Sequence, residues 1–357
     1  MKEIENKGTA QRAYALDALR GYAIITMVLS ATIASGILPG WMYHTQTPPP
    51  GHVYNPALSG LTWVDLVFPF FLFSMGAAFP FSLGRKLEKG ANAFRLIWDS
   101  VLRGLQLTFF AIFIQHFYPY ELSSPQDFRS WALALLAFAL LFPMFMRIPL
   151  QMPRWLHSVI KLSAYGIAFW LMTFVDRVGG KSWSLESSNV IILLLANMAV
   201  FGSALYVLTK SNRLARLAVL LCLMAVFLSA TVGGSWAQAV FDFSPFPWMY
   251  KFTYLKYLFI VIPGSFAGEY LAIWMRERSL QLSVRDRDDE KIAPFLLAIS
   301  IAAIISNLYF LYCRQAEANL LVTTGLLLGG GLLLHRKEGY NSRLWRNLFY
   351  SGAYLLF

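Results

Sequence analysis

Long apolar runs recur along the whole chain, and short polar segments separate them. A helix needs about 20 mostly apolar residues to cross a bilayer. The runs of about that length cover residues 16–38, 63–83, 97–117, 130–149, 155–175, 189–209, 214–233, 253–275, 293–312 and 318–335. The pattern predicts an all-α polytopic helix bundle with about 10–11 transmembrane helices. An eleventh run begins near residue 344 and is too short to cross, so we expect a chain that is cut short at its C-terminus.

Composition supports the membrane interpretation, because 57% of the residues are hydrophobic and only 14% are charged. Soluble domains carry about 25% charged residues. We therefore expect one transmembrane domain over residues 1–357. The net charge is +11, but the basic residues lie in short loops, so we predict no nucleic-acid partner. The two cysteines have no Cys or His neighbour at a metal-binding spacing, which predicts no metal site and no disulfide.

Lysine and arginine concentrate in alternate loops, and this bias sets membrane orientation. The segments rich in lysine and arginine are the N-terminus and the loops that follow the even-numbered spans. We therefore place the N-terminus and these loops in the cytoplasm. Residues 276–292, with charges of mixed sign, are interpreted as a solvated cytoplasmic loop. The loop 39–62, which contains two histidines, is expected on the outer side.

Ionisable and strongly polar groups inside spans are costly and often mark a site. Near the inner face, Asp17 and Arg20 are three residues apart, and Asp99 and Arg103 four apart. Each pair could be structural, which the spacing favours, or could face an anionic cytosolic ligand. Near the outer face we expect a second layer of polar side chains, made of His44, His52, Asp65, His116, Lys256 and Asn307.

The eighth span has small residues at a helical spacing and one carboxylate. Gly264 and Gly268 are four residues apart, which lets another helix approach closely. Glu269 follows and needs a partner or water. At the outer face, a histidine can accept a proton or carry an acyl group, and a carboxylate can orient it. Such spacing alone is a weak signal, because a loop histidine is more often an ordinary polar residue.

Two stretches carry a family resemblance. RAYALDALRGYAIITMVLS and GLTWVDLVFPFFLFSMG resemble the opening of the heparan-alpha-glucosaminide N-acetyltransferase family and its bacterial relatives of unassigned function. The resemblance implies acetyl transfer from cytosolic acetyl-CoA to an amino sugar or envelope glycan across a bacterial inner membrane. It makes Asp65 a site residue, with a histidine from the preceding loop as the catalytic partner. Arg20 would meet a CoA phosphate at the cytosolic mouth, with Asp17 and Arg103 nearby.

The sequence departs from the family pattern at two positions. Asn55 stands where the family has its histidine, five residues before the Gly-Leu-Thr motif, and Ala31 stands where it has an asparagine. Either His44 or His52 could take the catalytic role, and WMYH favours His44 because it resembles the aromatic stretch before the family's histidine. His116, Lys256 and Asn307 would contact the acceptor. Membrane lipid is the other expected partner, and a homodimer stays open.

Three alternatives remain at the level of sequence. Another class of membrane acyltransferase, which O-acetylates surface polysaccharide, shares the Leu-Asp-x-x-Arg-Gly opening but uses a histidine further along the first span. ITMVLSATIASG contains none. A transporter or flippase for a glycan or lipid-linked sugar would keep the outer polar layer, although transporters often show internal repeats and midplane sites. The third alternative is a catalytically inactive relative.

Overall fold

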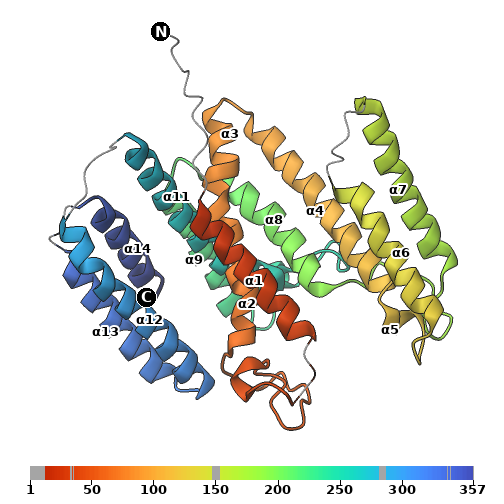
Figure 1. The fold of residues 1–357 in the computed structure, drawn as a ribbon, viewed down its shortest axis with the longest axis horizontal. Coiled ribbons are helices and arrows are strands. Elements are labelled where there is room, and N and C mark those ends of the chain that lie inside the picture. The colour runs from red at the N-terminus through yellow and green to blue at the C-terminus, as the bar shows by residue number, and fades with distance from the viewer. Residues whose placement is uncertain are drawn as a thin grey trace. The chain divides into compact units, whose positions relative to one another are not determined.

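The computed structural model describes residues 13–32, 34, 36–146, 153–280, 287–335, 337 and 339–356. These residues form helices and no strand (Figure 1). The longer helices are α1 (Tyr14–Thr32), α2 (Trp63–Phe79), α4 (Ala93–His116), α6 (Phe128–Phe145), α7 (Arg154–Phe174), α8 (Val190–Leu208), α9 (Arg213–Ser229), α11 (Leu258–Leu280), α12 (Arg287–Tyr312), α13 (Ala316–Leu334) and α14 (Tyr340–Leu356). Among the described residues, 8 helices are long and apolar enough to cross a membrane. The prediction of an all-α polytopic membrane protein is confirmed.

Each of the apolar runs predicted to span contains a helix, but two of these helices are not among the eight. α9 has 17 residues, at the short end of what crosses a bilayer. α7 has 21 residues, and His157 and Lys161 make its first half polar. The last helix, α14, begins at Tyr340, before the predicted residue 344, and it also has 17 residues.

Two predicted boundaries are wrong. The first span was expected to reach residue 38, but α1 ends at Thr32. Gly36 has a φ of 86°, which a right-handed helix does not accommodate, so the apolar residues Ile37 and Leu38 after it belong to a turn. In the predicted loop 276–292, residues 276–280 belong to α11 and residues 287–292 to α12, and residues 281–286 lie outside the described part of the chain. Charges of mixed sign are compatible with helical turns as well as with a loop.

The chain forms two compact units. Unit 1 comprises residues 1–91, 206–217 and 257–357, and unit 2 comprises residues 92–205 and 218–256. The shorter elements are α3 (Arg85–Glu88), α5 (Pro119–Leu122), α10 (Trp236–Asp242), the 3₁₀ helices η1 (Gly40–Met42) and η3 (Phe252–Tyr257), and the π-helix η2 (Pro80–Gly84). α2, η2 and α3 are continuous, so this span runs to Glu88 rather than to the predicted residue 83.

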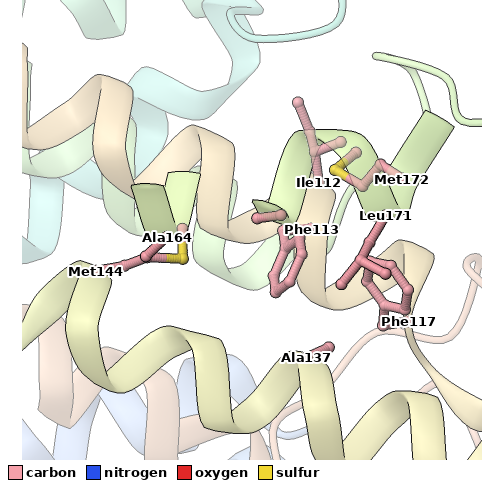
Figure 2. Packing of buried hydrophobic residues seen from close by; sticks show 9 residues of the cluster. Ile112, Phe113, Phe117, Ala137, Met144, Ala164, Leu171 and Met172 are labelled. Atoms are coloured by element: carbon pink, nitrogen blue, oxygen red, sulfur yellow. The ribbon is translucent and has the colours of Figure 1, made fainter. Parts of the chain in front are cut away.

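Unit 2 has a core of aromatic and aliphatic side chains from α4, α6 and α7 (Figure 2). Phe113 of α4 and Phe117, which directly follows that helix, have ring centroids 5.0 Å apart, and both are almost fully buried. Met144 from α6 and Met172 from α7 are each 2% exposed. Helices that are apolar on most sides still need such interlocking side chains, because lipid gives no hydrophobic drive to helix association.

In unit 1, α2 and α11 lie so close that only glycine fits at their contact. A Cβ on Gly264 would overlap the carbonyl oxygen of Phe73, and one on Gly268 would overlap that of Ala77. From the other side, Gly76 of α2 lies against the carbonyl of Val261. The close approach predicted from Gly264 and Gly268 is therefore present, and its partner is α2, the helix that carries Asp65.

A buried ion-pair network joins the start of α9 to α11. The Arg216 side chain is 0% exposed, and its Nη1 lies 2.9 Å from Glu269 Oε1. The guanidinium also donates to Ser265 Oγ at 2.9 Å and to Thr209 Oγ1 at 3.1 Å. The second oxygen of Glu269 accepts from Arg213 Nε at 2.7 Å. The sequence counts both arginines as loop cations and leaves the partner of Glu269 open, whereas the structure pairs all three.

The glycine contact makes a stability prediction. Gly268→Ala is expected to lower the free energy of unfolding by about 1–3 kcal/mol, because the methyl group forces α11 away from α2. Gly325→Ala in α13 is the control, since nothing lies within 4 Å of its added Cβ and alanine favours a helix. Thermal unfolding in detergent measures both. Equal unfolding midpoints for the two variants would show that the close contact between α2 and α11 does not determine the stability of the protein.

The ion-pair network makes a second prediction. Glu269→Leu is expected to cost about 3–5 kcal/mol of unfolding free energy, because Arg216 keeps a buried charge without its carboxylate. The double variant Glu269→Leu/Arg216→Met should regain most of that loss. Arg276→Met is the control, because its ion pair with Glu88 is exposed and such pairs contribute less than about 1 kcal/mol. A double variant no more stable than Glu269→Leu would contradict this account.

Candidate active site

The loop between α1 and α2 is held at both ends. The Tyr43 hydroxyl accepts from the backbone nitrogens of Ile37 and Leu38, at 3.0 and 2.8 Å, and lies 3.1 Å from the Ala34 carbonyl oxygen. At the other end, the Leu61 nitrogen donates to the carbonyl of Leu311 at the end of α12. These bonds fix the segment that carries His44.

His44 and Asp65 form the central pair of the loop. His44 Nδ1 lies 2.6 Å from Asp65 Oδ1. The other carboxylate oxygen accepts from the Thr62 nitrogen at 3.0 Å, the Thr62 hydroxyl at 2.8 Å and the Thr45 nitrogen at 3.2 Å. Asp65 also lies in the first turn of α2, where a negative charge suits the helix dipole. Several donors and the dipole thus stabilise the carboxylate form.

The pairing decides which nitrogen of His44 is available for chemistry. A carboxylate only accepts hydrogen bonds, so we assign the imidazole proton to Nδ1. Nε2 then carries the lone pair. The His44 side chain is 59% exposed, whereas that of Asp65 is 16% exposed. The arrangement therefore presents an oriented imidazole, with its acceptor nitrogen turned away from the carboxylate.

The second histidine of the loop packs elsewhere. His52 has a φ of 48° and lies edge-on to Tyr43, with ring centroids 4.5 Å apart. It is not among the hydrogen-bond partners described for Asp65. Its Nε2 is buried and has no partner among the described residues, as is also true of the Thr45 hydroxyl. Asn55 accepts from the Ala57 nitrogen in a turn.

Of the predicted acceptor residues, Asn307 belongs to unit 1 and His116 and Lys256 belong to unit 2. Asn307 of α12 donates to Thr323 Oγ1 and accepts from Asn319, both on α13, at 3.0 Å each. His116, at the end of α4 in unit 2, is 2% exposed and bonds the Val175 carbonyl oxygen through Nε2 at 2.8 Å. Both arrangements are those of side chains that hold helices together. Lys256 is exposed on η3, also in unit 2.

The predicted donor residues lie on two helices. Asp17 and Arg20 are half-buried on α1, one turn apart. Asp99 and Arg103 are exposed on α4, in unit 2, and the contacts described for that helix include no ion pair between them. The structural pairing that their spacing favours is thus not seen for Asp99 and Arg103 among the described residues.

A small hollow lies between α1, η1 and α2, within unit 1, and has room for about one water molecule. Its lining includes Trp63 and Val64, the two residues before Asp65. Its two hydroxyls, on Thr26 and Ser30, bond to carbonyls of their own helix, so the wall offers mainly apolar surface. The lining residues are Thr26, Leu29, Ser30, Leu38, Met42, Trp63, Val64 and Val67.

Comparison with known proteins gives one family. The model of a domain of unknown function, DUF5009, matches residues 12–271, which extends from just before α1 into α11. The match includes His44, Asp65, Arg216 and Glu269. No curated protein and no solved structure matches the chain.

Removing the carboxylate is expected to loosen the loop. Asp65→Ala leaves the Thr62 and Thr45 nitrogens without their acceptor, which should cost about 1–3 kcal/mol of unfolding free energy. Faster hydrogen exchange at the amides of residues 44–62 would report it. Glu317→Ala, which removes an exposed first-turn carboxylate of α13, is the control. Unchanged exchange in Asp65→Ala would show that these bonds do not hold the loop.

Proposed function

The chain belongs to the DUF5009 family, described as a domain of unknown function. From the resemblance of its first two spans to transmembrane acetyltransferases and from the geometry of His44 and Asp65, we propose that it is a membrane-embedded acyltransferase. It moves an acetyl group from cytosolic acetyl-CoA to an amino sugar or envelope glycan on the outer side of a bacterial inner membrane. The observation that carries the proposal is the 2.6 Å contact between His44 Nδ1 and Asp65, which leaves Nε2 as an oriented acceptor.

His44 can serve the transfer in either of two ways. As a general base, Nε2 takes the proton of the acceptor amine while the amine nitrogen attacks the thioester carbonyl and the thiolate leaves. As a nucleophile, Nε2 attacks the carbonyl itself, the thiolate leaves, and the ring holds the acetyl group until the amine nitrogen takes it and gives up its proton to the freed Nε2. In both, the ring gains positive charge, which the Asp65 carboxylate stabilises.

The surroundings of the pair support transfer of a short acyl group. The hollow between α1 and α2 begins at Trp63 and Val64, next to Asp65, and continues to Val67 one helical turn further. Its apolar wall suits the methyl end of an acetyl group. On the predicted cytosolic side, Arg20 provides a fixed charge for a CoA phosphate, with Asp17 one turn away on the same helix.

We assign the catalytic role to His44 rather than to His52, because His44 contacts Asp65 and His52 packs against Tyr43. His52 then supports the loop. His116 and Asn307 hold helices.

The test is acetyl transfer from labelled acetyl-CoA to glucosamine, with the chain in proteoliposomes. His44→Ala should lower the rate about 100-fold or more, because the base or acyl carrier is lost. His52→Ala should retain more activity than His44→Ala, and His157→Ala in α7 should match the wild type. Wild-type activity in His44→Ala would refute the assignment. Glucosamine uptake without acetyl-CoA would instead favour a transporter.

A further inference from the structure

Arg314 adopts a backbone conformation that normally selects glycine. Its φ is 62°, and it terminates α12, where the Gln315 nitrogen donates to the Phe310 carbonyl at 2.8 Å. A left-handed residue with this bond is the usual helix C-terminal motif, and glycine occupies it most often because it has no Cβ. The backbone conformation costs more free energy for arginine than for glycine, so the presence of arginine at this position needs a reason that lies in its side chain.

The turn that contains Arg314 packs against the loop of the candidate site. Gly60 has a φ of 115°, and a Cβ there would lie 2.9 Å from the Leu311 carbonyl oxygen, 3.4 Å from Arg314 Cγ and 3.5 Å from Thr45 Cγ2. The stem of Arg314 and the side chain of Thr45 therefore both border Gly60. Thr45 follows His44 in the chain, and its nitrogen donates to Asp65.

The charge of Arg314 has no described counterpart. The side chain is exposed, and neither an ion pair nor a hydrogen bond is described for its guanidinium. Glu317, three residues further along, makes no described ion pair with it. Among the described residues, Arg314 and His52 are the two non-glycine residues with positive φ, and both border this loop. Strained backbone concentrates at functional sites.

We propose that Arg314 binds a phosphate or carboxylate group of the acceptor, beside the His44–Asp65 pair. The inference rests on the proposed function and specifies its acceptor as an anionic sugar. A guanidinium suits this task because its paired N–H donors match two oxygens of such a group. A phosphate could come from the acceptor itself or from a phospholipid headgroup, and the experiment separates these sources.

The experiment measures binding, so that it does not depend on catalysis. The full chain is placed in phosphatidylcholine nanodiscs, and glucosamine 6-phosphate and glucosamine are titrated by calorimetry. The wild type should bind the phosphorylated sugar about tenfold more tightly, as one charge-assisted contact provides. Arg314→Gly should abolish that preference, leave glucosamine binding unchanged and not lower the thermal midpoint, because glycine suits the backbone. Arg85→Ala, on α3, should keep the preference.

Equal affinity of the wild type for both sugars, or a preference that survives Arg314→Gly, would overturn the proposal. A preference that disappears when the nanodiscs contain phosphatidylglycerol would also overturn it, because a lipid headgroup then occupies the arginine. A preference for the phosphorylated sugar that persists in phosphatidylglycerol nanodiscs would support the binding of an acceptor phosphate by Arg314. Acetyl transfer is measured on the same samples. A preference without any transfer would support the anion site and reject the acetyltransferase.

Discussion

The contact between α2 and α11 is the constraint on which unit 1 depends. Glycines on both helices let backbone meet backbone, so the carbonyls of Phe73 and Ala77 stand where side chains would otherwise be. α2 carries Asp65 in its first turn, and α11 carries Glu269 next to Gly268. Two carboxylates, one near each predicted face of the membrane, are therefore positioned by one helix pair. A larger residue at the contact would displace both.

The two carboxylates illustrate how the same chemistry becomes structural or reactive. The oxygens of Glu269 are taken by Arg213 and Arg216, and Arg216 donates further to Ser265 and Thr209 while fully buried. The hydrogen bonds that Arg216 donates therefore hold neighbouring helices together. Asp65 is equally well supplied with donors, but its partner His44 uses only one ring nitrogen and is largely exposed. A saturated pair holds helices together, and an unsaturated one can act on a substrate.

Much of the fold could be predicted from hydropathy, because lipid requires every spanning segment to be helical and apolar. The helix boundaries could not. α1 ends at Thr32, before its apolar run does, and α11 continues beyond its apolar run to Leu280. Small-residue spacing predicted a close contact for α11, but the partner helix is visible only in three dimensions. The candidate site was predictable as a residue set, since Asp65 and the two loop histidines stand out in an apolar sequence.

What the sequence by itself determined is the class of the protein and the positions where polar groups interrupt its spans. Those properties depend on composition and on order along the chain. Only the tertiary structure shows that His44 rather than His52 contacts Asp65, because both lie in one loop and the path of that loop sets which ring reaches the carboxylate. It also paired Arg216 with Glu269, and it brought Arg314 against Gly60 from the far end of α12. Contacts between residues distant in sequence depend on how helices pack, which periodicity along a single chain does not specify.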